Sequence, residues 1–226
     1  HGGTRACLED GSLAAQCDGE VLPVAECGIN DVDESCDGHS VAHLWSQKVG
    51  GFDIERIIGS AVLADGSAVF TGYSWGPMSV GDKVVDPGAF VFAMDGLGAV
   101  LWAKSFGEPE GAVGISVALD LQRDVILTGF AKTPIDFGGG VLSPPQQMDV
   151  IAKLSGANGE HLWSRFLGGG VDLTVDSIVA VDASGSSVVA GQYEGTLAWP
   201  EGDIPAGPVA ERHLFLSFLD PSGTHV

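Results

Sequence analysis

The sequence has few basic residues and no long apolar run. Only 10 lysines and arginines stand against 30 aspartates and glutamates in 226 residues, which gives a net charge of −20 at pH 7. Such a chain repels nucleic acid and anionic lipid, because both are bound mainly through Lys and Arg. No apolar run approaches the ~18 residues that a membrane-spanning helix needs. We therefore expect no nucleic-acid partner and no membrane span.

The composition favours turns and strands over helices. Hydrophobic residues make up 45% of the chain, which is enough for a packed core and excludes wholesale disorder. The 34 glycines and 11 prolines argue against a helical bundle. A chain of 226 residues corresponds to one ordinary domain or two small ones.

Cysteine is missing from the whole chain beyond residue 36. An even number of cysteines in a short acidic segment predicts two disulfides, which are typical of exported proteins, and three pairings are open. Zinc is the weaker interpretation, because no two cysteines have the two-residue spacing of zinc sites. We expect residues 1–40 to form a separate cysteine-rich segment of a secreted or cell-surface protein. The cysteines are Cys7, Cys17, Cys27 and Cys36.

Four carboxylates gather within seven residues beside the last cysteine. Calcium prefers such oxygen donors in a loop that ends on glycine, although the twelve-residue EF-hand pattern is absent. The alternative, which we favour, is a solvated acidic turn next to a disulfide. The candidate calcium ligands are Asp31, Asp33, Glu34 and Asp37.

The rest of the chain repeats one unit three times, over residues of about 43–99, 100–160 and 161–226. Each unit begins with a tryptophan strand, continues with an apolar strand that ends at a turn near an aspartate, and then has a strand that ends in a small-residue pair. A Gly/Pro-rich loop and a third apolar strand follow. The tryptophans recur at intervals of about 60 residues, and they are Trp45, Trp102 and Trp163.

This pattern predicts an all-β fold of tandem four-stranded antiparallel blades, as in a β-propeller. A blade cannot bury both of its faces alone, so neighbouring blades stack. We expect the three tryptophans to be packing anchors between blades, because an indole buries a large area. Closed propellers use four or more blades, so the three repeats are either open or completed by other blades, and we expect the chain to be a fragment of a longer array.

The repeats resemble a known family. They are similar to the β-propeller repeat of large secreted proteins from myxobacteria and their relatives. The residues that carry the likeness are 162–169, 181–185, 189–191 and 219–225, with 128–130, 135–140 and 149–154 in the middle copy. The short N-terminal segment resembles the Asp-rich, Cys-containing segments of such proteins. The resemblance covers about residues 43–226 and implies an exported β-propeller, and it brings no general set of catalytic residues.

A second likeness concerns residues 152–163, which look like the tryptophan-docking turn of quinoprotein propellers. A quinone cofactor would follow from that likeness. Only one copy shows the motif well, and no set of basic residues is evident for the carboxylates of the cofactor.

Catalytic motifs are missing from the sequence. It has no H-E-x-x-H, no G-x-S-x-G and no P-loop. An acid pair of the glycosidase kind is conceivable among Asp136, Asp149 and Asp172. We expect a non-enzymatic module for protein or glycan binding, or a structural role, at the cell surface. The alternatives are a propeller enzyme (quinoprotein-like or carbohydrate-active) and a subunit of an extracellular assembly that self-associates through open strand edges.

Overall fold

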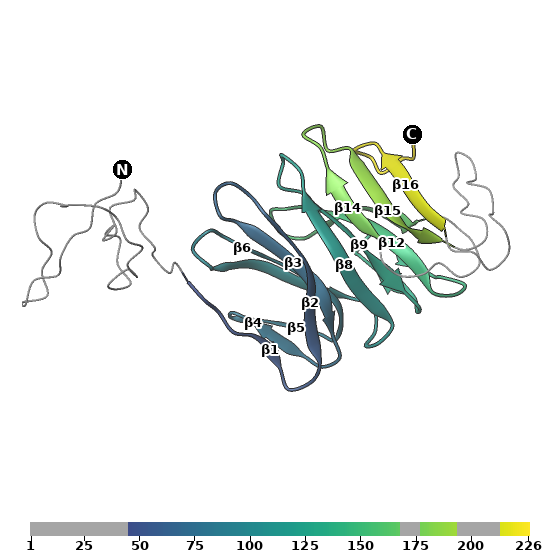
Figure 1. Cartoon of the computed structure of the whole chain (residues 1–226). Helices are drawn as coiled ribbons and strands as arrows, with labels where there is room; N and C mark the ends of the chain where they lie inside the picture. Colours follow the sequence, from purple (N-terminus) through teal and green to yellow (C-terminus); the bar gives the residue numbers. More distant parts are fainter. Residues whose placement is uncertain (1–44, 168–176, 194–212) are drawn as a thin grey trace, which may run out of the picture. The chain divides into compact units, whose positions relative to one another are not determined.

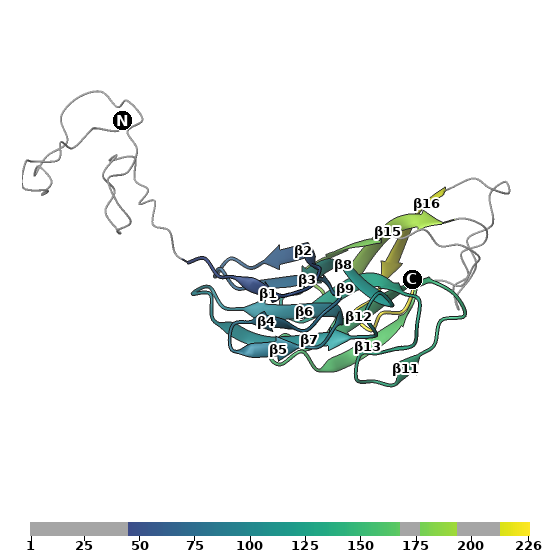
Figure 2. The ribbon, with the colours of Figure 1, turned by 90° about the horizontal axis from the view of Figure 1, so that it is seen from below.

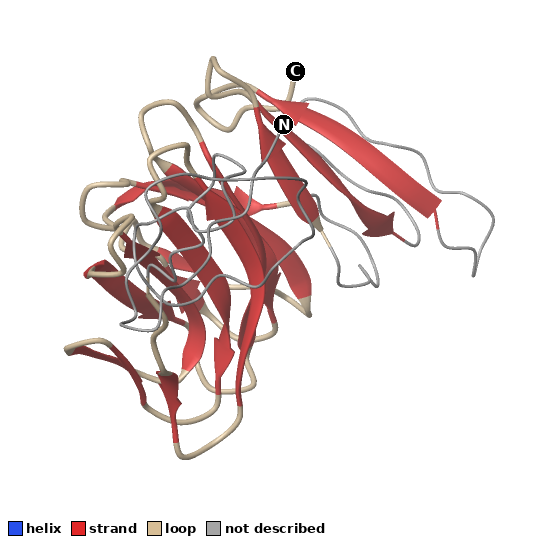
Figure 3. Ribbon diagram, turned by 60° about the vertical axis from the view of Figure 1, so that its left-hand side comes forward, coloured by secondary structure: helices blue, strands red, loops and turns tan. Residues whose placement is uncertain are grey.

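The computed structural model describes residues 45–167, 177–193 and 213–226. The chain forms two units, His1–Ser46 and Gln47–Val226, and nearly all described residues belong to the second. Within the described ranges every regular element is a strand (Figure 3). The same ranges contain no helix that is long and apolar enough to cross a membrane.

Three antiparallel sheets form the body of the second unit (Figure 1). Sheet 1 has the order β2(Glu55–Val62), β3(Ala68–Ser74), β6(Gly88–Met94) and β7(Val100–Phe106). Sheet 2 has the order β8(Ala112–Leu119), β9(Val125–Ala131), β12(Met148–Leu154) and β13(His161–Phe166). Sheet 3 consists of β14(Ile178–Val181), β15(Ser187–Tyr193) and β16(His213–Leu219). These repeated meanders confirm the predicted all-β, propeller-like architecture of four-stranded blades.

The sequence repeat and the sheets are offset by one strand. The tryptophan strand that opens the second repeat, β7, is the last strand of sheet 1, and the strand that opens the third repeat, β13, is the last strand of sheet 2. In sheet 3, His225 occupies the first position of the corresponding strand. It forms a β-bridge with Leu219, just as His161 of β13 pairs with Leu154. A short turn before each tryptophan strand causes the offset, because it forms a hairpin with the preceding strand.

Two small sheets come from the loops between the second and third strands of the blades. β4(Met78–Val80) pairs with β5(Lys83–Val85) on one side and with β1(Val49–Gly51), which precedes β2, on the other. β5 lies beside β7 of sheet 1 (Figure 2). In sheet 2 the corresponding loop holds the hairpin of β10(Ile135–Asp136) and β11(Val141–Leu142).

The core lies between the sheets, because strands β6 and β12 are buried on both faces. Alternate residues of a strand point to opposite faces, so Val91 of β6 packs in the layer between sheets 1 and 2, together with Val150 and Leu154 of β12. Ile151, the residue of β12 between those two, packs in the layer between sheets 2 and 3 with Phe215.

Aspartates shape the hairpin turns of the blades. In the turns that start at Asp95, Asp120, Asp182 and Asp220, the carboxylate accepts hydrogen bonds of 2.8 to 2.9 Å from the backbone N–H groups two and four residues later. The fourth residue of each turn has a positive φ, which glycine adopts without strain. The turn signals seen in the sequence are therefore side-chain caps of strand hairpins.

Candidate binding surfaces

Two of the three repeat tryptophans dock onto the next sheet. The indole N–H of Trp102 donates to the carbonyl of Gly156 at 2.8 Å, and that of Trp163 donates to the carbonyl of Pro221 at 3.1 Å. Both acceptors lie in the turn that follows the third strand of the next sheet. Trp45 is half-buried just ahead of β1 in the sequence.

The ring of each docked indole lies on a glycine. A Cβ atom added to Gly159, which has φ 70°, would be 2.7 Å from the Trp102 ring, and one added to Gly223 would be 2.9 Å from the Trp163 ring. The segment 152–163 that looks like a quinoprotein docking turn therefore works here as a packing joint. It receives Trp102 at Gly159 and contributes Trp163 to the following joint.

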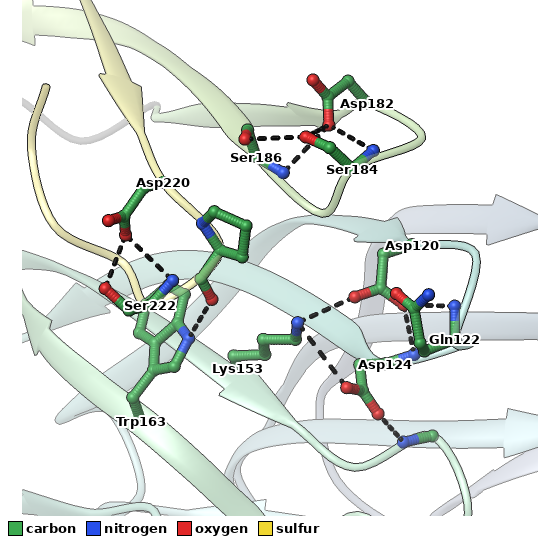
Figure 4. A network of polar contacts seen from close by, with 12 residues as sticks. Asp120, Gln122, Asp124, Lys153, Trp163, Asp182, Ser184, Ser186, Asp220 and Ser222 are labelled. Carbon is green, nitrogen blue, oxygen red and sulfur yellow. Dashed lines mark hydrogen bonds and ion pairs between the residues drawn. The ribbon is translucent and has the colours of Figure 1, made fainter.

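A buried charge cluster supports the first of these joints (Figure 4). The ammonium of Lys153 lies 2.8 Å from Oδ2 of Asp120 and 3.6 Å from Oδ2 of Asp124. The other Asp124 oxygen accepts the N–H of Gly156 at 3.1 Å, and the Gly156 carbonyl holds Trp102. Asp120 is 2% exposed and Lys153 8%, so each charge depends on the other for stability.

Several candidate residues lie outside the described ranges. These are the four cysteines Cys7, Cys17, Cys27 and Cys36, the carboxylates Asp31, Asp33, Glu34 and Asp37, and Asp172. Their disulfides and calcium site stay predictions. Within the described ranges there is no group of three or more His, Cys, Asp or Glu residues that would suit a metal ion.

The two described acid candidates have different surroundings. Asp136 is exposed in β10, and its carboxylate accepts the N–H groups of Gly138 at 2.7 Å and Gly140 at 3.1 Å, so it shapes a loop. Asp149 is 1% exposed within β12. The groove of about 560 Å³ beside Asp136 also contains Glu160 and His161, whose Nε2 lies 3.0 Å from the hydroxyl oxygen of Ser164.

An aromatic pocket of about 420 Å³ lies at the seam between sheets 1 and 2. We call it the seam pocket. It lies at the ends of the strands away from the aspartate turns. Sheet 1 contributes one wall and sheet 2 the other, and Glu110 comes from the turn that joins the two sheets. The lining residues are Ile58, Tyr73, Trp75, Glu110, Val113, Ile115, Phe130 and Lys132.

Matching irregularities in β2 and β8 border the seam pocket. The register of β2 on β3 shifts between Ile57 and Gly59, and that of β8 on β9 shifts between Gly114 and Ser116. Such bulges leave one residue unpaired and redirect side chains. The extra residues are Ile58 and Ile115, and both line the pocket.

The outer face of sheet 3 is open and apolar. Leu214 is 80% exposed, Leu216 76% and Phe218 44%. Ile178 and Val188 of the neighbouring strands are also exposed. We call these five residues the open face. Cross-strand pairing aligns Ile178 with Ala190 and Ala190 with Leu216, so the apolar surface is continuous across the sheet.

The corresponding faces of the other sheets are covered. Counted back from the residue before the turn, Leu216 corresponds to Val91 in sheet 1 and Ile151 in sheet 2, and both of these are fully buried. The sequence predicts an apolar strand over residues 213–219, but the pattern of the three corresponding strands is alike and does not distinguish an exposed face from a covered one. The open face differs only in lacking a covering sheet among the described residues.

The matches to solved structures include one weak likeness. The chain is similar to the crystal structure of BamB from Moraxella catarrhalis, at 15% identity and a TM-score of 0.29, over 75% of this chain and 51% of that chain. The matched part thus spans about half of that neighbour. No protein-family model matches the sequence, and no curated protein matches it. The propeller-like fold stands on the strand topology.

Proposed function

We propose that the chain is a non-enzymatic module for protein binding at the cell surface, and that the open face is its docking surface. The observation that carries the proposal is the exposure of Leu216, at a position where Val91 and Ile151 are fully buried. A contiguous apolar patch on a folded sheet marks an interaction site. The early run of cysteines and the resemblance to repeats of secreted proteins support an exported location.

The occupant we assign to the open face is another β-sheet of the same kind, and for the isolated chain it is a second copy. Sheets 1 and 2 show how such a face is satisfied, because the next sheet presents residues like Val150 or Phe215 against it. The five residues of the open face carry no charge. The net charge of −20 opposes association of two copies, so salt should strengthen it by screening.

Sedimentation velocity of the full chain tests this proposal. We expect a concentration-dependent dimer that grows with ionic strength. The double variant Leu216→Glu/Phe218→Glu should be monomeric with an unchanged circular-dichroism spectrum, because both side chains are exposed and their loss leaves the core intact.

The matched control is Leu97→Glu/Leu121→Glu, which adds the same charge at two exposed turn residues outside the open face. It should self-associate as the wild type does. A wild type that stays monomeric at high protein and salt concentration would overturn the assigned occupant. Equal dissociation of the control and the face variant would overturn the role of the open face.

For the N-terminal segment we propose two disulfides and a solvated acidic turn at Asp31, Asp33, Glu34 and Asp37, with a calcium loop at these four residues as the alternative. Thiol titration of the unfolded, unreduced chain should find no free cysteine among Cys7, Cys17, Cys27 and Cys36. If the calcium loop is present, calcium should raise the melting temperature relative to chelator, because a ligand that binds the folded state stabilises it. An unchanged melting temperature would leave the solvated acidic turn as the explanation.

A further inference from the structure

The seam pocket lies beside two bulges, one in sheet 1 and one in sheet 2. The two bulges at Ile58 and Ile115 lie at the same place in β2 and β8. The backbones of the two strands touch there, since a Cβ atom added to Gly59 would lie 2.7 Å from the carbonyl oxygen of Ile115. Beside this contact lies an open pocket of about 420 Å³, lined by both bulge residues. A concave site with apolar walls and a few polar groups is the usual form of a small-ligand site.

Aromatic rings are the main feature of the pocket. The Tyr73 and Trp75 rings have centroids 6.2 Å apart and are tilted by 36°. Trp75 is 38% exposed, and Phe130 of sheet 2, which also lines the pocket, is half-buried. Exposed aromatic rings in a cavity offer a large, rigid and partly polar contact area for a ligand.

The charged residues restrict the chemistry of that ligand. The Lys132 ammonium lies 5.4 Å from the centre of the Phe130 ring, so a cation already occupies this ring face. A quaternary ammonium ligand would therefore meet a like charge in the pocket. The net charge of −20 repels polyanions. With cations and polyanions excluded, the pocket suits a neutral ligand. Such a ligand needs apolar surface to contact the aromatic rings and hydroxyl groups to bind Lys132 and Glu110.

Glu110 adds a sign of strain. It follows Pro109 in a turn closed by a 3.0 Å hydrogen bond from the Gly111 N–H to the Glu108 carbonyl, and its φ is 60°. Glycine or asparagine is favoured at that position of a turn. Strained residues cluster where a binding site needs a particular side chain. The Gly111 carbonyl accepts the backbone N–H of Lys132 at 2.7 Å. This hydrogen bond holds the Glu110 turn beside the end of β9 in sheet 2.

We propose that the seam pocket binds a neutral oligosaccharide. The C–H faces of a pyranose ring suit Trp75 and Tyr73, and its hydroxyl groups suit the carboxylate of Glu110 and the ammonium of Lys132. A cavity of about 420 Å³ accommodates a short run of sugar units. This proposal is independent of the open face, because the pocket lies between sheets 1 and 2.

Titration calorimetry of the full chain with neutral tetrasaccharides tests the proposal. Cellotetraose, chitotetraose, laminaritetraose and maltotetraose are the probes, and tryptophan fluorescence is the second readout. We expect at least one of them to bind. Trp75→Ala should weaken that binding by about tenfold or more, and the face variant Leu216→Glu/Phe218→Glu should bind as the wild type does. Failure of the open face and failure of the pocket are thus separable.

Glu110→Gly is the sharper variant, because glycine suits the backbone at φ 60°. It should keep or raise the melting temperature while it weakens sugar binding. Arg123→Gly is its matched control, since Arg123 also has a positive φ but lies in a turn at the opposite strand ends. This control should bind sugar normally. The proposal is wrong if none of the four sugars binds, if Trp75→Ala and Glu110→Gly bind as the wild type does, or if only a proline-rich peptide or choline binds.

Discussion

The guanidinium of Arg123 donates a hydrogen bond to the carboxylate of Asp65, and so ties the first hairpin turn of sheet 2 to the corresponding turn of sheet 1. A second hydrogen bond of 3.0 Å joins Arg123 to the hydroxyl oxygen of Ser67. Arg123 has φ 68°, at the position where the corresponding turns of sheets 1 and 3 have Gly66 and Gly185. Arg123 therefore makes its side-chain contacts to sheet 1 from a backbone conformation that is strained for a residue other than glycine.

Arg123→Gly should be at least as stable as Arg123→Ala, although both lose the contact to Asp65. Glycine relieves the left-handed backbone, which costs an alanine about 1 kcal/mol, and the lost ion pair is exposed and contributes little. Urea unfolding of the two variants and the wild type measures the difference. A glycine variant that is clearly less stable than the alanine variant would show that the strain argument is wrong.

Acid should destabilise the fold through the aspartate turns. The Ser67 hydroxyl, with the Ser67 N–H and Arg123, lowers the pKa of Asp65 to about 2. The Ser184 hydroxyl holds the pKa of Asp182 below its ordinary value, and the Ser222 hydroxyl does the same for Asp220. A carboxyl with a lowered folded-state pKa contributes stability above its unfolded pKa of about 4, and this stability is lost as pH falls through the folded pKa.

The measurement is the free energy of unfolding from pH 5 down to pH 2. The wild type should lose stability over the lower part of this range. Asp182→Asn/Asp220→Asn keeps an oxygen acceptor in each turn but removes two titrating groups, so its curve should fall less steeply. Comparing slopes cancels the opposing effect of reduced charge repulsion, which acts on both proteins. Parallel curves would refute the role of these turns in acid sensitivity.

Lys153→Met should be strongly destabilising, because it leaves the carboxylate of Asp120 buried without its cation. Breaking a buried ion pair from one side costs about 3 to 5 kcal/mol. Lys153→Met/Asp120→Asn should recover part of the loss, since the substituted amide is neutral and its oxygen can still accept the N–H groups of Gln122 and Asp124. Chemical denaturation gives the coupling energy. Additive effects of the two substitutions would show that the charges do not depend on each other.

The repeat architecture was predictable from particular residues. Trp102 and Trp163 recur with glycines at Gly159 and Gly223, and this spacing is what the docked joints require. The aspartate that starts each turn likewise predicts a hairpin. Lys153 in an otherwise apolar strand is also a signal in the sequence, because a buried lysine needs a partner such as Asp120.

The seam pocket was only partly predictable. Tyr73 and Phe130 stand out in the sequence, because each follows a small-residue pair at the same place in its repeat. Trp75, Glu110 and Lys132 come from loops, whose content differs between the copies and whose approach depends on tertiary packing. The open face was also hidden, since burial depends on what covers a strand and not on its pattern alone.

Trp102→Ala should lower the free energy of unfolding by about 3 to 5 kcal/mol, as expected for a large buried ring. Trp102→Phe should have an intermediate effect, because it keeps a ring over Gly159 but leaves the Gly156 carbonyl without its 2.8 Å hydrogen bond. The exposed Trp75→Ala is the control and should change the stability little. Urea unfolding, followed by circular dichroism to avoid tryptophan signals, measures all three variants. If Trp102→Ala were as mild as Trp75→Ala, the indole would not be the joint between sheets 1 and 2.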